Sequence, residues 1–346
     1  MSKPVLRGLS SLKLLRETQL QIMLSSSLLM IMGTNIIYPI LPVIHDSLHI
    51  PKVQIGLIIL AFTFPAVFMA PLAGFVADLR GRKWVMAIGL LLYGFAGLGI
   101  SLVSKFKWLL FLRSLQGIGY SGVMPLAFCV LRWIPEPDIV KHNRILPYFK
   151  DVFSLVRRLY CLTIFSISSL RHFLEVGFFT YLPIFALETL GISVAKGGFL
   201  FTVYALGAMF TASQPGELAL RFQRINLVIL AFLMQGVCLL IVPAAPGIIW
   251  LGVTMLFFGL ANGVISPSHK SLPTQSAPGK LRGGVVSVDR VLQNMCKTVS
   301  PLIAGVILSL SKVDMVFIVL AAMALVWVII VLVLHAGGHL QPGVWK

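Results

Sequence analysis

Charged side chains inside long apolar runs are the residues of this chain whose types and spacing could do chemistry. Arg171 and Glu175 lie four residues apart in one such run. Lys297 lies near the middle of a second run, and Arg113 lies near the start of a third. An ionised group is costly in the hydrocarbon core of a membrane unless it faces a cavity or a partner. We therefore expect these four residues to face a cavity or a partner and to act as transport or coupling residues, with snorkelling to the outer surface as the alternative for Arg113.

Two interpretations of Glu175 remain open. Arg171 can share its helix face, which would make a self-satisfied ion pair. Alternatively, Glu175 is a proton or cation site, because desolvation favours the protonated form of a carboxyl group. His172 points to a different face of the same helix and is expected to be packed or interfacial. Lys297 has no local partner, since Asp289 is eight residues away, so it is expected to face water or to pair with Glu175 on another helix.

The composition is that of a membrane protein. The 346 residues are 58% hydrophobic and only 11% charged, with a mean hydropathy of +0.95, far outside the soluble class. The net charge of +17 could suggest a nucleic-acid partner, but that would require a basic face on a soluble domain. No nucleic acid is therefore expected, and membrane orientation has to explain the charge.

The elements that must position these residues are runs long enough to cross a hydrocarbon core of ~30 Å as helices. We expect ten spans, at residues 19–42, 53–77, 84–104, 108–130, 160–187, 196–215, 225–243, 247–267, 285–310 and 314–335. Pro243-Ala-Ala-Pro-Gly247 marks the turn that divides one long uncharged stretch into two helices. The first run is too long for a signal-peptide core and lacks a small-residue cleavage site, so we expect a retained span. The predicted fold class is an all-α polytopic membrane protein.

The cations in the connections predict the orientation. The connections on the side of the N-terminus hold 20 Lys and Arg residues, and those on the other side hold five. Basic residues favour the cytoplasmic side. Both termini are therefore expected to be cytoplasmic, and the excess basic charge is assigned to topology and anionic lipid headgroups.

A short charged segment, Gly74-Phe-Val-Ala-Asp-Leu-Arg-Gly-Arg-Lys83, joins the second and third predicted spans. Glycines at both ends let two helices approach closely, and the carboxylate would be held ionised by its arginine neighbours. We expect a conformational latch formed by Gly74, Asp78, Arg80, Gly81 and Arg82. The pattern resembles the loop between spans 2 and 3 of the major facilitator superfamily, although that family often has a cation where this chain has Leu79.

A weakened copy of this segment, Gly216-Glu-Leu-Ala-Leu-Arg-Phe-Gln-Arg224, indicates two related halves. The resemblance implies a major-facilitator-like helical bundle of two six-span halves, with the substrate site at the midplane between them. The two copies are 142 residues apart, whereas six spans with their connections need about 200. Arg113-Ser-Leu-Gln-Gly-Ile-Gly119 resembles the family's span 4, and Trp133-Ile-Pro-Glu-Pro137 resembles the end of span 6.

Spans 5 and 6 are therefore expected to be absent, with the seam near residues 127–130. The domains expected are a four-span half-bundle at residues 1–130, a basic cytoplasmic connector at 131–158 and a six-span half-bundle at 159–346. The resemblance also implies a proton-coupling role for Arg113. It implies a substrate cavity formed by Asn35, Tyr38, Gln116 and Asn262, for which hydrogen bonds between helices are the alternative.

The functional expectation is secondary transport. No nucleotide-binding loop, Ser-His-Asp arrangement or metal-binding box is visible, so no enzyme, cofactor or metal site is expected. Tyr38-Pro-Ile-Leu-Pro42 and Tyr181-Leu-Pro183 resemble drug-exporting antiporters. That resemblance implies alternating access and proton-coupled efflux of a small amphipathic or drug-like solute at the cell membrane. The expected partners are lipid, solute and protons, with a homo-oligomer left open. The alternatives are an internally deleted, non-transporting remnant and an uptake transporter of the same family.

Overall fold

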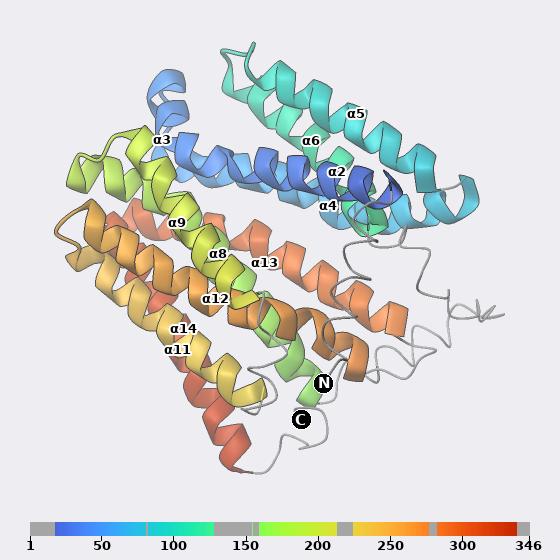
Figure 1. Ribbon diagram of the computed structural model, residues 1–346. Coiled ribbons are helices and arrows are strands. Elements are labelled where there is room, and N and C mark those ends of the chain that lie inside the picture. Colours follow the sequence, from blue (N-terminus) through green and yellow to red (C-terminus); the bar gives the residue numbers. More distant parts are fainter. Residues whose placement is uncertain are drawn as a thin grey trace, which may run out of the picture. The chain divides into compact units, whose positions relative to one another are not determined.

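A computed structural model describes residues 18–80, 82–127, 154, 159–212, 224–276 and 282–337, and nearly all of them are helical (Figure 1). The helices are α2 (Thr18–Asn35), α3 (Ile37–Leu48), α4 (Lys52–Arg80), α5 (Arg82–Ile100), α6 (Phe106–Ala127), α8 (Leu159–Leu190), α9 (Val194–Ala212), α11 (Arg224–Ile241), the 3-10 turn η1 (Val242–Ala244), α12 (Ile248–Ser276), α13 (Arg282–Leu310) and α14 (Val313–Ala336).

These helices follow from the long uncharged runs, because a backbone in lipid must satisfy its hydrogen bonds within its own segment. The described residues contain eight candidate membrane spans, judged by length and composition alone. They match eight of the ten predicted spans. The remaining two fall on α5, whose apolar part Trp84–Ile100 is shorter, and on α6. The predicted all-α membrane class is confirmed, and the number ten stays a prediction.

Prolines account for two of the helix boundaries. The predicted first span is two helices, because α2 ends at Asn35 and α3 begins at Ile37. Pro39 has no N–H to give to the carbonyl of Asn35, and its ring crowds that carbonyl, so the helix breaks there. The predicted turn at residues 243–247 is present as η1, with Pro243 inside its three residues.

The chain divides into two compact units. The first unit comprises Met1–Ile37 and Ala61–Ile139, and the second comprises Tyr38–Leu60 and Val140–Lys346. Each is described here by itself. The predicted domain boundaries stay predictions, and the expected seam lies at the end of α6 and outside the described residues beyond it.

The first unit is held together by close helix approaches. α5 and α6 cross at two glycines: a Cβ atom on Gly89 would lie 2.8 Å from the carbonyl oxygen of Gly119, and one on Gly119 would lie 2.6 Å from that of Gly89. Only a residue without a side chain allows this approach. The Tyr93 hydroxyl of α5 donates to the carbonyl of Met30 in α2 at 3.2 Å, which ties α2 to the pair.

The second unit is built around α8, which packs against α9, α12, α13 and α14. Its aromatic side chains form much of the core: Phe178, Tyr181 and Phe185 are completely or almost completely buried. The first turns of α4 pack on α13, where a Cβ atom on Gly56 would lie 2.7 Å from the carbonyl oxygen of Pro301. Burial of α8 on several sides explains why charged groups on it must find partners within the protein.

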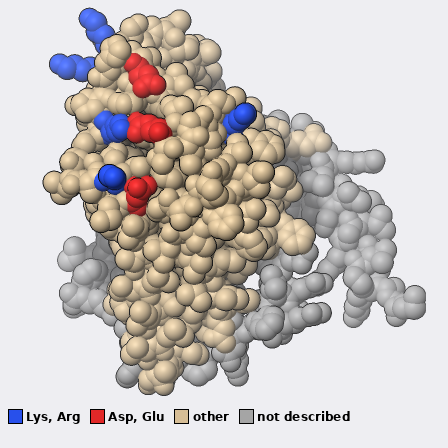
Figure 2. Space-filling model, turned by 90° about the vertical axis from the view of Figure 1, so that its left-hand side faces the viewer, with Lys and Arg blue, Asp and Glu red and all other residues tan. Residues whose placement is uncertain are grey.

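The outer surface of the described helices is largely apolar. Many large hydrophobic side chains are exposed, among them Phe95, Leu98, Phe199 and Ile249. On the face drawn in Figure 2, the few described charged side chains gather toward one end and the rest is uncharged. Such a surface suits contact with lipid and would be costly in water.

Candidate functional site

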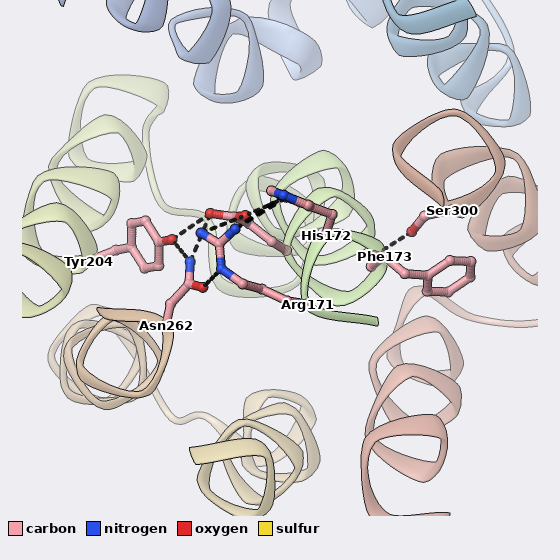
Figure 3. A network of polar contacts seen from close by, with 7 residues as sticks. Arg171, His172, Phe173, Tyr204, Asn262 and Ser300 are labelled. Atoms are coloured by element: carbon pink, nitrogen blue, oxygen red, sulfur yellow. Dashed lines mark hydrogen bonds and ion pairs between the residues drawn. The ribbon is translucent and has the colours of Figure 1, made fainter. Parts of the chain in front are cut away.

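A network of charged and polar side chains lies inside the second unit, and it includes Arg171, His172, Tyr204 and Asn262 (Figure 3). All four contact Glu175 of α8. Arg171 lies one helical turn before Glu175, and its Nη2 is 3.5 Å from Glu175 Oε2. The Nδ1 of His172 is 3.5 Å from the same oxygen. The side chains of all three residues are at most 17% exposed. The predicted ion pair between Arg171 and Glu175 is therefore formed, and it is nearly enclosed.

Two other helices complete the network. The Tyr204 hydroxyl of α9 donates to Glu175 Oε1 at 2.6 Å. The amide nitrogen of Asn262 in α12 donates to the same oxygen at 2.8 Å and also contacts the Tyr204 hydroxyl. The Nε of Arg171 donates to the amide oxygen of Asn262 at 2.5 Å. Both oxygens of the carboxylate therefore have partners. Oε2 faces Arg171 and His172, and Oε1 accepts hydrogen bonds from the neutral donors Tyr204 and Asn262.

Glycines set the distance between α9 and α12, the helices that carry Tyr204 and Asn262. Gly259 of α12 lies directly against the backbone carbonyl of Tyr204, and Gly263 lies against that of Ala208. A Cβ atom on Gly207 would lie 2.6 Å from the carbonyl oxygen of Leu256. Because the two backbones touch without intervening side chains, the residues next to the contact can meet over Glu175.

His172 differs from its sequence-based expectation, and of the two alternatives for Lys297 the pair with Glu175 is not formed. The His172 ring contacts Nη1 of Arg171 at 3.2 Å as well as Glu175, so it joins the network and does not lie on a separate, merely packed face. Lys297 of α13 lies within electrostatic range of Glu175 and Arg171 but forms no ion pair with Glu175 in the structure. The hypothesised pair between Lys297 and Glu175 is therefore not formed, and the contacts of Glu175 come from Arg171, His172, Tyr204 and Asn262.

Arg113 and Gln116 belong to the first unit. Arg113 is only 4% exposed, and its Nη1 donates to Gln116 Oε1 at 3.1 Å. The guanidinium carbon lies 5.9 Å from the ring centre of Phe62, within the range of a cation–π contact. Gln116 was expected in the substrate cavity, and in the structure it holds the buried guanidinium.

The two other expected cavity residues have different environments. Asn35 is exposed at the end of α2. Tyr38 is buried in an aromatic group of the second unit, with its ring centre 5.7 Å from that of Phe179 and 6.4 Å from that of Phe201. Phe179 in turn lies 4.7 Å from the ring of Tyr204, so the aromatic group adjoins the Glu175 network.

The expected latch lies largely outside what the structure describes. Gly74, Asp78 and Arg80 fall in the last turns of α4, and Arg82 begins α5. Gly81 lies outside the described residues, and the side chains of the others are likewise not described. The latch therefore stays a prediction.

The match to a family is extensive. The sequence profile described as Major Facilitator Superfamily matches residues 23–138 and 159–342. The chain belongs to this family. It is therefore a multi-pass membrane protein of a transporter family, and the proteins that it resembles are transporters and not enzymes.

Individual relatives resemble parts of the chain. The bacillibactin exporter of Bacillus subtilis (strain 168) is 33% identical over 107 residues, which cover 30% of this chain and 27% of that protein. The quinolone resistance protein NorA of Staphylococcus aureus is 29% identical over 97 residues, covering 28% of this chain and 25% of NorA. The matches thus span about a quarter of the length of these relatives.

Solved structures share the fold over most of the chain. The nucleoside transporter NupG has a TM-score of 0.69 at 12% identity, covering 92% of this chain and 96% of NupG. A bacterial homologue of the human lysosomal transporter Spinster, in an inward-facing and unoccupied conformation, has a TM-score of 0.67 at 12% identity. That comparison covers 95% of this chain and 98% of the other. At such identities the likeness establishes the fold alone.

Sequence reasoning missed Tyr204 in the network. The ion pair could be found because its partners are four residues apart, and Asn262 was proposed from its place on a cavity-lining span. Tyr204 stands in an apolar run with no charged residue near it that would signal its role. An unpaired polar group in such a run is costly. A hydroxyl group there is therefore a signal, though a weak one, for a buried hydrogen bond.

Proposed function

We propose that this protein is a secondary active transporter that moves a small amphipathic or drug-like solute across the cell membrane by alternating access, with proton-coupled efflux. The observation that carries the proposal is the enclosed Glu175 network, because ionised groups are kept inside membrane-crossing helices chiefly where they bind or move charge. Family membership and the exporters among the relatives support the direction of transport.

The network links the charge of Glu175 to the packing of three helices. With Glu175 ionised, Arg171 is compensated, and Tyr204 and Asn262 tie α9 and α12 to α8. A proton on Glu175 would remove the negative charge, leave Arg171 without its counter-ion and weaken both ties. Protonation would therefore favour a different arrangement of α8, α9 and α12, which is what coupling between a proton and a conformational change requires.

The solute would meet aromatic and amide groups near this network. Tyr38, Phe179 and Phe201 supply apolar ring faces, and Asn262 supplies a polar group beside the Glu175 carboxylate. Apolar walls with a few convergent polar groups suit an amphipathic solute. In this proposal Arg113 and Lys297 contribute to coupling, and Asn35 and Gln116 contribute to the cavity of the first half.

The proposal is tested with purified protein in lipid vesicles, by measuring dye flux driven by an imposed proton gradient. We expect the parent protein to show gradient-driven flux, and Glu175→Gln to abolish its pH dependence while dye binding stays measurable. Glu188→Gln is the matched control, because Glu188 is an exposed carboxylate of the same helix paired with Lys52.

A double variant separates coupling from a purely structural pair. If the pair is only structural, Glu175→Gln should lower expression, and adding Arg171→Gln should partly restore both expression and pH-dependent flux. Restored pH-dependent flux would rule out Glu175 as the proton carrier. Absence of flux from well-folded parent protein across a panel of dyes would instead support the non-transporting remnant, and gradient-driven movement in the opposite direction would support uptake.

A further inference from the structure

A second buried carboxyl group, Asp289 of α13, lies apart from the Glu175 network. It is only 4% exposed and stands at the beginning of the candidate span Val288–Leu310. Its partners are a hydroxyl and an amide: Ser168 of α8 donates to Oδ1, and the side-chain nitrogen of Gln293 donates to Oδ2 at 2.6 Å. Neither partner carries a charge, which distinguishes this carboxyl group from Glu175.

Among the described residues, the charged side chains near Asp289 form no ion pair with it. Arg290 is adjacent in sequence but exposed, and it forms no ion pair with Asp289 in the structure. Lys297 lies two turns further along α13, and Arg171, His172 and Glu175 lie one to two turns beyond Ser168 on α8. None of the described side chains of α12 is charged. The charged or titratable side chains of α14 are Asp314, in its first turn, and the exposed His335, in its last turn.

An apolar cluster lies on the same two helices as Asp289 and Ser168. Cys161 and Phe165 of α8 are buried against Val285 of α13, with Val288 and Leu292 packed on them. Cys161 and Phe165 precede Ser168 along α8, and Val285 precedes Asp289 along α13, so these members of the cluster are nearer the starts of the two helices. A carboxylate that is desolvated and lacks a cation is costly, and binding a proton is the ordinary way to remove that cost.

Ser168 can satisfy Asp289 in either protonation state. Its hydroxyl oxygen also lies 3.4 Å from the carbonyl oxygen of Ile164 and 3.3 Å from that of Phe165. A hydroxyl has one hydrogen to donate and can also accept. With Asp289 ionised, that hydrogen goes to the carboxylate. With Asp289 protonated, the acid donates to the Ser168 oxygen and the Ser168 hydrogen turns to a backbone carbonyl, while Gln293 continues to donate to Oδ2.

We propose that Asp289, with Ser168 and Gln293, is a proton-binding site separate from the Glu175 network. The carboxylate takes one proton from a hydronium ion: an O–H bond forms on Asp289 as an O–H bond of the hydronium ion breaks, water is released, and the charge of the side chain changes from −1 to zero. Ser168 stands about one turn before Arg171 and His172, and Gln293 about one turn before Lys297. The site therefore lies along the packed α8–α13 pair, between the starts of these helices and the Glu175 network.

Infrared difference spectroscopy of the protein in lipid nanodiscs tests this site without any need for transport. The parent protein is changed from alkaline to mildly acidic buffer, and the carbonyl stretch of newly protonated carboxyl groups is recorded. We expect a band from a buried carboxylic acid that Asp289→Asn removes. Glu175→Gln should leave that band in place, and so should Asp46→Asn, which changes an exposed carboxylate. If Asp289→Asn removes no component of the buried-acid signal that Glu175→Gln leaves in place, or if the parent shows no buried-acid band, the proposal is overturned.

A serine variant keeps the test decisive if Asp289→Asn fails to fold. Ser168→Ala retains the carboxyl group but removes the acceptor of its proton, so the carbonyl band should shift in frequency. Ser166→Ala is the matched control on the same helix, because the Ser166 hydroxyl bonds to Thr163 and Trp327 and not to Asp289. Equal spectra for Ser168→Ala and the parent would overturn the assignment. Since no flux is measured, these results stand or fall separately from the transport test.

Discussion

At the scale of single residues, the charge of Glu175 is shared among partners of two kinds. Arg171 and His172 face one oxygen, and Tyr204 and Asn262 face the other. Hydrogen bonds to a charged group are stronger than those between neutral groups, and an unmet buried charge costs more than an unmet neutral atom. The neutral donors should therefore matter for stability as well as for coupling.

Tyr204→Phe tests this point by removing one hydroxyl from the carboxylate. We expect a loss of roughly 1.5–3 kcal/mol in the free energy of unfolding, as for a hydrogen bond to a charged group. The measurement is denaturant unfolding in mild detergent. Tyr181→Phe serves for comparison, because the Tyr181 hydroxyl donates to the neutral carbonyl of Pro301 and should cost only about 1 kcal/mol. Equal losses in the two variants would contradict a special role for the charged acceptor.

At the scale of helices, α9 and α12 are a pair whose glycine contacts position the site. The backbones meet at Gly207, Gly259 and Gly263, next to Tyr204 and Asn262. An added methyl group has no room at Gly207 or Gly259, because the nearest atom it would meet is a backbone oxygen, and at Gly263 it would meet both the Thr211 hydroxyl and the carbonyl of Ala208. Separation of the two helices would move both hydrogen-bond donors away from Glu175.

Gly259→Ala is expected to separate α9 from α12, with a loss of about 1–3 kcal/mol for the overpacked contact and a clear fall in gradient-driven flux. Gly252→Ala on the same helix is the matched control, since its Cβ atom would meet only a Leu200 methyl group, at 4.0 Å. Thermal unfolding and vesicle flux measure the two effects. If both variants behave like the parent, the glycine contact does not position the site.

The connection between α4 and α5 carries a second prediction at this scale. Asp78→Asn removes the one carboxylate among Arg80, Arg82 and Lys83. If that charge pairing holds one of two conformations, the variant should lose transport by a much larger factor than it loses membrane insertion. Insertion is measured by the amount of protein in the membrane fraction, and transport by dye flux per inserted molecule. Unchanged flux in Asp78→Asn would contradict the latch.

At the scale of the whole molecule, the distribution of cations predicts the orientation in the membrane. Twenty basic residues fall in connections on one side and five on the other, and the bias places the richer side in the cytoplasm. Family membership and the apolar outer surface agree with a multi-pass protein, while the side on which each connection lies is a separate question for labelling.

Single cysteines test the orientation, in a chain whose four native cysteines have been replaced. We expect Phe106→Cys, at the first residue of α6, to react with a membrane-impermeant reagent added outside the cell. Arg80→Cys should react only after the membrane is opened. Protection at residue 106 together with external reactivity at residue 80 would reverse the topology.

The amino-acid sequence was enough to predict the class of the protein and the extents of most helices, and it offered the ion pair on α8 as one of two interpretations of Glu175. These are local properties: a run of apolar residues must form a helix in lipid to satisfy its own backbone, and residues four apart on a helix are neighbours. The break after Asn35 is also local, since it follows from Pro39. The family resemblance of the latch segment was confirmed as family membership, while its role stays a prediction.

The partners of Glu175 on other helices could be found only from the packing of those helices. Tyr204 and Asn262 are 29 and 87 residues away along the chain, and Ser168 and Asp289 are separated by 121. Which residues become partners depends on how the helices pack. For α9 and α12 that packing depends on glycine contacts between backbones and not on spacing in the sequence. Tertiary packing also sets the position of Lys297, which forms no ion pair with Glu175 even though both are charged groups inside predicted spans.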